Sequence, residues 1–218
     1  MPPTRPFRTY LFDLDGTLID SIGLIMSSYR HTMREHLGEI PADDVWRSGF
    51  GTPLRTQIER FARTEHEAEA MRLTYVRYTD AHHDQMVVVY PGIREALASL
   101  RETGARLAIV TSKNRRSMWR GLRLCGLDGF FDAFVTVDDV DAYKPDPAPV
   151  VEALDRLSAL SEEAVFIGDS PHDVAAGRAA GVQTAAALWG PFPREELERQ
   201  GPDHWLSQPS DITTFADG

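Results

Sequence analysis

The chain has one cysteine, almost no lysine, no long apolar run and a net negative charge. Because Cys125 is the only cysteine in 218 residues, a disulfide framework and a cysteine-based zinc site are excluded. No apolar run approaches the ~20 residues of a membrane-spanning helix, and residues 1–9 lack the apolar segment of a signal peptide. The net charge of −10 argues against nucleic acid, which binds basic faces. We therefore expect a cytoplasmic protein with neither a membrane nor a nucleic-acid partner.

Lysine occurs only at Lys113 and Lys144, whereas the chain has 21 arginines. A lysine ammonium is a compact point charge on a flexible stem, and an arginine guanidinium is a broad planar fork. Chance retention is one explanation for the two lysines. The alternative is a requirement for a compact cation, because Lys144 lies in one of the motifs described below and Lys113 directly follows another.

The overall composition, 42% hydrophobic and 26% charged, is typical of a folded domain with a substantial core. Residues 20–87 show helical apolar spacing and no convincing strand. The residues after them alternate short apolar runs with helical patterns, which indicates βαβ units and a parallel sheet. We predict a doubly wound, Rossmann-like α/β core with a mostly parallel sheet over 1–19 and 88–218, and an inserted all-helical domain over 20–87.

The predicted elements follow from this periodicity and from turn signals. After a buried strand that ends at Phe12, the expected strands are 106–110, 134–137, 164–167 and 184–188. The expected helices are 22–37, 53–61, 64–78, 92–104, 115–125, 147–157 and 171–180.

Two acids, Asp13 and Asp15, directly follow the first buried strand and precede Gly16. Residues i and i+2 of a strand point to the same side, so both carboxylates should project together. Adjacent carboxylates resist joint ionisation unless a cation lies between them. The pair therefore indicates a divalent metal, with one carboxylate left to attack or to move a proton. A plain turn cap is the alternative explanation for this pair.

Polar residues also follow three later strands, and ligands of open parallel sheets bind beyond the carboxyl ends of strands. These residues are Thr111 and Ser112, Lys144, and Asp169 and Asp173. Together with the first two acids they supply a nucleophile, hydroxyl and N–H donors, a cation and metal ligands. Phosphoryl transfer needs these groups, so we predict a small phosphorylated substrate.

Four motifs in this order and spacing resemble those of the haloacid dehalogenase superfamily. They are Asp13-Leu-Asp15-Gly-Thr17, Val110-Thr111-Ser112, Lys144-Pro145 and Gly168-Asp169-Ser170-Pro-His-Asp173. The resemblance covers essentially the whole chain, and the helical insert resembles that superfamily's cap domain. The nearest branch looks like the bacterial phosphoglycolate phosphatases and the similar inorganic pyrophosphatases.

The resemblance implies a role for each acid of the motifs. Asp13 would attack phosphorus and become an aspartyl phosphate. Asp15 would protonate the leaving oxygen and then deprotonate the hydrolytic water. Mg²⁺ would be held by the Asp13 carboxylate, the Asp15 backbone carbonyl and Asp169. Asp173 would support the metal through water or hold Lys144; an ordinary acid in the first turn of a helix is an equal alternative.

The remaining candidates would contact the substrate. The resemblance implies that Thr111 and the Ser112 N–H bind phosphate oxygens and that Lys144 neutralises both phosphate and nucleophile. Lys113 is a candidate for the leaving group, with a solvated surface lysine as the alternative. Arg47 and Arg55 flank a Gly-Thr-Pro loop at 51–53 and could pair with a carboxylate or second phosphate, or simply be solvated.

We expect a magnesium-dependent phosphatase, with 2-phosphoglycolate as the first substrate and pyrophosphate as the alternative. A sugar phosphomutase and a non-catalytic phosphoryl-binding module are further alternatives. Hinges near 17–21 and 84–90 would let the helical insert close over the site. The sequence leaves the oligomeric state open.

Overall fold

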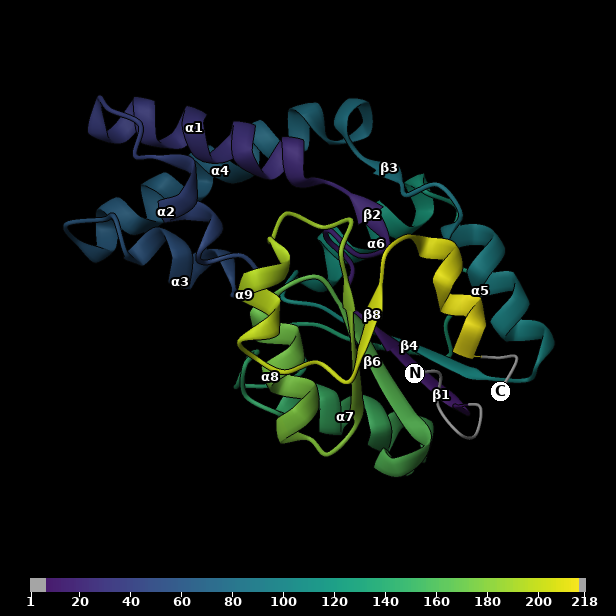
Figure 1. Cartoon of the computed structure of the whole chain (residues 1–218). Coiled ribbons are helices and arrows are strands. Elements are labelled where there is room, and N and C mark those ends of the chain that lie inside the picture. The colour runs from purple at the N-terminus through teal and green to yellow at the C-terminus, as the bar shows by residue number, and fades with distance from the viewer. Residues whose placement is uncertain (1–6, 216–218) are drawn as a thin grey trace.

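The computed structural model describes residues 7–215 and contains a six-stranded sheet in the order β5-β4-β1-β6-β7-β8 (Figure 1). Every neighbouring pair in this sheet is parallel. The strands are β1 (Thr9–Phe12), β4 (Arg106–Val110), β5 (Ala133–Val135), β6 (Ala164–Gly168), β7 (Gln183–Ala187) and β8 (His204–Leu206). The predicted α/β fold with a parallel sheet is confirmed. Residues 1–6, where no signal peptide is predicted, and 216–218 lie outside the described range.

Side-chain alternation in β1 builds the two faces of the core. Tyr10 and Phe12 point into one apolar cluster, and Leu11 between them points into the other. The first cluster is covered by α5 (Ile93–Glu102), α6 (Arg115–Leu124) and the 3-10 segment Pro209–Phe215. The second is covered by α7 (Ala148–Leu157) and α8 (Pro171–Ala179). Full burial of each such side chain contributes about 1.5–3 kcal/mol, so the sheet is a rigid platform for residues at its strand ends.

A helical segment leaves the sheet after β1 and returns before α5 (Figure 1). It consists of α1 (Ile22–Leu37), α2 (Asp43–Arg47), α3 (Leu54–Glu59) and α4 (Glu65–Met86). Tyr29 of α1 stacks on Trp46 of α2 with ring centroids 4.2 Å apart. Helix α4 is longer than the predicted 64–78, because no glycine or proline interrupts it before Pro91. None of the helices within residues 7–215 has the length and apolarity needed to cross a bilayer.

The two connections between the helical segment and the sheet pair with each other. Strands β2 (Ile19–Asp20) and β3 (Val88–Val89) form a separate antiparallel pair. They lie within the two predicted hinges at 17–21 and 84–90. Neither strand was predicted from the sequence, and α2, β8 and α9 (Arg194–Glu198) were not predicted either. Each of these elements is two to five residues long, too short to show a hydrophobic period.

Candidate active site

Asp13 is the first residue after β1, and its backbone continues the sheet. Its N–H donates to the carbonyl of Ile167 in β6 at 3.0 Å, which fixes the direction of the side chain. The chain then turns at Gly16, whose φ is +83°. A Cβ on Gly16 would lie 2.5 Å from Asp169 Oδ2, so only glycine permits this close approach. The turn therefore packs directly against Asp169, which follows the neighbouring strand β6.

Asp169 follows β6 and is buried at 3% exposure. Thr17 Oγ1 donates to its Oδ1 at 2.6 Å. Gly190 lies against the other side of Asp169, because a Cβ there would come within 2.3 Å of the Asp169 Cβ. The acid is thus held between two glycine backbones and one hydroxyl.

Lys144 lies on the loop after β5 and is 1% exposed. Its Nζ donates to Asp13 Oδ1 at 2.7 Å, to Asp173 Oδ1 at 2.6 Å and to the Val110 carbonyl at 3.2 Å. Three acceptors match the three protons of an ammonium. The buried lysine is therefore fully bonded and points at the expected nucleophile.

Asp173 combines two of the roles that the sequence analysis left open. Its Oδ1 holds Lys144, while its Oδ2 accepts from the Ser170 N–H at 3.0 Å and the Ser170 hydroxyl at 2.6 Å. The Ser170 hydroxyl in turn caps α8 by accepting from the Asp173 N–H at 3.2 Å, which completes a capping box. Asp173 is thus both a lysine partner and a first-turn acid.

Three carboxylates offer ligand atoms within 4.8 Å of one another: those of Asp13, Asp169 and Asp173. Burial raises the pKa of Asp13 to about 7, although Lys144 acts to lower it. Burial and the nearby charges of the other two acids also raise the pKa of Asp169. Three buried acids beside one lysine leave a surplus of negative charge. Hard carboxylate oxygens in this setting fit Mg²⁺.

Asp15 is not a member of this cluster. Its Oδ1 accepts from Lys113 Nζ at 2.9 Å and from the Ser21 hydroxyl. Both Lys113 and Asp15 have side chains only 19% exposed. The structure therefore places Lys113 inside the site, beside the expected acid/base residue, and not on the solvated surface.

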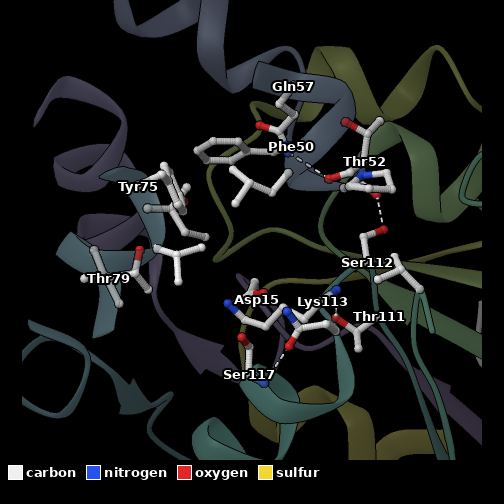
Figure 2. Close-up of a pocket in the computed structure, with 18 of the residues that line it drawn as sticks. Asp15, Phe50, Thr52, Gln57, Tyr75, Thr79, Thr111, Ser112, Lys113 and Ser117 are labelled. Carbon is white, nitrogen blue, oxygen red and sulfur yellow. Dashed lines mark hydrogen bonds and ion pairs between the residues drawn. The ribbon is translucent and has the colours of Figure 1, made fainter. Parts of the chain in front are cut away.

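Thr111 and Ser112 follow β4 and line the same cavity. Thr111 Oγ1 accepts from the Lys113 N–H at 3.2 Å. The Ser112 hydroxyl donates to the carbonyl of Gly51, which belongs to the loop between α2 and α3. Ser112 consequently connects the sheet to the helical segment (Figure 2).

The cavity has a volume of about 370 Å³ and lies between the strand ends and the helical segment. Asp13, Asp15 and Asp169 line its sheet side. Figure 2 shows Phe50, Gln57, Tyr75 and Thr79 of the helical segment on the other sides of the space. Most of the predicted residues therefore meet in one cavity, which is larger than a phosphate group alone requires.

The sequence that forms this site matches a known protein family. The family of haloacid dehalogenase-like hydrolases matches residues 10–187. The chain belongs to the haloacid dehalogenase-like hydrolase family. The matched range contains all four motifs that suggested this family from the sequence.

Two curated relatives and one solved structure resemble this hydrolase over nearly its whole length. Pyrophosphatase PpaX from Halalkalibacterium halodurans is 39% identical over 206 residues, which cover 94% of each chain. A provisionally named pyrophosphatase PpaX from Caldanaerobacter subterraneus subsp. tengcongensis is 41% identical over 197 residues, 90% of this chain and 88% of its own. A provisionally named phosphoglycolate phosphatase from Lactobacillus plantarum has a TM-score of 0.85 and 27% identity, covering 96% of this chain and 99% of its own.

The two candidate arginines of the helical segment, Arg47 and Arg55, are less closely associated with this hydrolase's cavity than the motif residues are. Arg55 lines the rim of the cavity, but its side chain is 71% exposed and pairs with Glu59 at 2.7 Å and Glu65 at 3.6 Å. Arg47 is not among the described residues that line the cavity. Their role in substrate binding therefore remains a prediction.

Several residues that shape the hydrolase's site were not predicted from the sequence. Ser21 and Thr17 bond to Asp15 and Asp169, and Tyr75 and His83 line the cavity from α4. Thr17 lies within the first motif, so its position was a usable signal. Tyr75 and His83 carry no local signal, because only the packing of α4 turns them towards the sheet.

Proposed function

We propose that this protein is a magnesium-dependent phosphatase that forms an aspartyl phosphate on Asp13. The supporting observation is the contact of Lys144 Nζ with Asp13 Oδ1 at 2.7 Å, because Oδ2 then has no hydrogen bond to any described residue. One oxygen of the nucleophile is anchored and the other is available. Attack by Oδ2 forms the bond to phosphorus and breaks the bond from phosphorus to the leaving oxygen.

Asp15 moves the proton in both halves of this reaction. Its Oδ1 is occupied by Lys113 and Ser21, so Oδ2 is the atom that exchanges a proton. In the first half it protonates the leaving oxygen. In the second half it takes a proton from the water that attacks phosphorus, which releases phosphate and restores Asp13.

Mg²⁺ would be held by the carboxylates of Asp13 and Asp169 and the backbone carbonyl of Asp15. When bound, the ion supplies positive charge to the phosphoryl oxygens. Thr111 and the Ser112 N–H would donate to the same oxygens. Support of the ion by Asp173 through water is a further part of the proposal.

For the substrate we propose pyrophosphate first and 2-phosphoglycolate second. The relatives that are 39% and 41% identical carry the name pyrophosphatase, which outweighs our sequence-based preference for phosphoglycolate. The 27% identical structural relative supports phosphoglycolate as the second candidate. Lys113 lies beside Asp15 and is suited to the second anionic group of either compound. A cytoplasmic location remains a prediction from the sequence.

We also propose that the helical segment, residues 20–87, is a cap domain that opens and closes on the paired strands β2 and β3. The closed arrangement would exclude bulk water from the phosphoryl group. Contacts between the cap and the core are both polar and apolar. Arg120 of α6 pairs with Asp80 of α4 at 3.0 Å, and the Phe50 ring packs edge-on to Phe192 with centroids 6.5 Å apart. Opening must break these contacts.

The proposal is tested by measuring phosphate release from pyrophosphate and phosphoglycolate with and without Mg²⁺. We expect Mg²⁺-dependent release from at least one of them, abolished in Asp13→Asn. This change is nearly isosteric, so the variant should keep its fold by circular dichroism. No release from either compound by a folded protein would favour the alternatives, a mutase or a phosphoryl-binding module.

A further inference from the structure

Helix α4 turns one face to the cavity. The residues of that face recur at the spacing of helical neighbours, every three or four positions. They are Arg72, Tyr75, Val76, Thr79, Asp80 and His83. Two of them, Tyr75 and His83, are buried and have polar atoms without a hydrogen-bond partner among residues 7–215.

Tyr75 is 7% exposed, and its hydroxyl makes no hydrogen bond to any residue in the described range 7–215. Its ring packs against Trp46 with centroids 6.1 Å apart, which limits its motion. Burial and the charge of Asp15 raise its pKa, so the hydroxyl stays protonated. Unlike the fully buried, unpartnered hydroxyls of Tyr10 and Tyr29, the Tyr75 hydroxyl is accessible from the cavity that Tyr75 lines, so it is available to a ligand.

His83 is 4% exposed, and its Nδ1 lies 2.8 Å from Asp84 Oδ1. A carboxylate accepts hydrogen bonds, so Nδ1 carries the proton and Nε2 is an acceptor. Arg120 holds Asp84 at 3.0 Å and so keeps the imidazole oriented. Nε2 has no partner among the residues that the structure describes.

The arginines that line the cavity from α4 and α6 already have acidic partners. Each arginine that α4 and α6 contribute to the lining forms an ion pair with an acid nearby. These pairs are Arg72–Glu69 at 2.7 Å, Arg116–Asp80 at 3.1 Å and Arg120–Asp80 at 3.0 Å. A second anionic group would therefore find no uncompensated arginine here, whereas an uncharged polar group would find Tyr75 and His83.

We propose that Tyr75 and His83 form a second subsite, which binds the uncharged, hydroxyl-bearing leaving group of an elongated phosphomonoester. This inference rests on the proposed phosphatase function and adds a substrate class to it. Eight residues of helix separate the two side chains, about 12 Å along the axis, which exceeds the reach of a pyrophosphate leaving group. Hydroxyls of a polyol chain can accept from the Tyr75 hydroxyl and donate to His83 Nε2.

The size and lining of the cavity agree with such a ligand. Its volume of about 370 Å³ leaves space beyond a phosphoryl group and its ion. Ile22, Ile25 and Val76 line the same space. These apolar side chains can contact the carbon chain of a polyol while the hydroxyls bond to the two α4 residues.

The test compares sorbitol 6-phosphate with pyrophosphate in the Mg²⁺-loaded enzyme. We expect hydrolysis of both, and we expect Tyr75→Phe and His83→Asn each to lower the ratio of kcat/KM for sorbitol 6-phosphate to that for pyrophosphate about tenfold. Asparagine retains a donor near Asp84 but has no counterpart of Nε2. The matched controls are Tyr78→Phe and His82→Asn, which change the same residue types on α4 outside the cavity lining and should leave the ratio unchanged.

The outcomes separate this inference from the proposed function. Hydrolysis of pyrophosphate without hydrolysis of sorbitol 6-phosphate, or an unchanged ratio in both cavity variants, overturns the inference alone. If only phosphoglycolate is hydrolysed, the inference alone is overturned. If pyrophosphate, phosphoglycolate and sorbitol 6-phosphate all remain intact, the proposed function fails, and calorimetric titration of pyrophosphate and sorbitol 6-phosphate into Asp13→Asn decides the subsite. Sorbitol 6-phosphate binding that is weakened by Tyr75→Phe but not by Tyr78→Phe would support the subsite, and equal binding in all variants would exclude it.

Discussion

Lys144 and Asp13 are 131 positions apart in the chain, yet their Nζ and Oδ1 atoms lie 2.7 Å apart in a site almost closed to solvent. The same ammonium bonds to Asp173 at 2.6 Å. Burial alone would lower the pKa of Lys144, but the two carboxylates outweigh it and raise that pKa. The lysine therefore stays charged, and it compensates two buried acids at once.

Replacing this lysine should destabilise the protein as well as inactivate it. Lys144→Met leaves Asp13 and Asp173 without a cation, and removal of one partner from a buried ion pair costs about 3–5 kcal/mol. We expect a loss of this size in the free energy of unfolding, measured by urea denaturation. The double variant Lys144→Met/Asp173→Asn should recover part of the stability but no activity. Equal stability of Lys144→Met and wild type would contradict the buried-pair interpretation.

Stability without metal should fall as pH rises. The folded-state pKa of Asp13 is raised to about 7 by burial, whereas an unfolded aspartate titrates near 3.9. The folded state thus holds more protons between about pH 4 and pH 7, and the free energy of unfolding decreases through that window. Thermal melts in EDTA from pH 5 to pH 8 measure this slope, and Asp13→Asn should flatten it.

The stabilisation of the protein by Mg²⁺ should increase as pH rises, because Mg²⁺ binds ionised carboxylates in competition with protons. We expect the increase in Tm on adding Mg²⁺ to be larger at pH 8 than at pH 6. Asp169→Asn, which removes an expected ligand, should reduce the increase at both values. An increase that is the same at pH 6 and pH 8 would argue against a metal on these acids.

Gly190 should be intolerant of a side chain. In Gly190→Ala the new Cβ would meet the Asp169 Cβ at 2.3 Å, so Asp169 must move. We expect a loss of about 1–3 kcal/mol in unfolding free energy and weaker Mg²⁺ binding in calorimetry. Gly129→Ala is the control, because a Cβ there has no neighbour within 4 Å.

Asp15→Asn should separate the two halves of the reaction. Loss of the proton donor and acceptor should lower kcat by about 10²–10⁴. With acetyl phosphate, whose leaving group needs little protonation, the variant should accumulate a phosphoprotein detectable by intact mass after acid quenching. Asp13→Asn should show no such mass increase. Failure of Asp15→Asn to accumulate it would indicate that Asp15 is not the base for the water step.

Local patterns in the sequence were sufficient to predict most of the sheet and the motif residues. The apolar run of β1 ends in two acids and a glycine, and Lys144 is one of only two lysines. Strands of three to five residues with strong β-formers, such as β4 and β6, could be predicted because a buried parallel strand is apolar throughout. Strand β8 (His204–Leu206) could not be predicted, because it is a strand only through its pairing with β7.

The sequence by itself determined which chemical groups stand at the strand ends, since parallel strands bring their carboxyl ends to one edge. Only the tertiary structure decided which contacts each of these groups makes. It paired Asp15 with Lys113 and left it out of the Asp13–Asp169–Asp173 cluster. It also placed Asp173 in contact with both Lys144 and Ser170. It also brought Tyr75 and His83 into the cavity. These arrangements depend on contacts between residues far apart in the chain, whose distances no local spacing encodes.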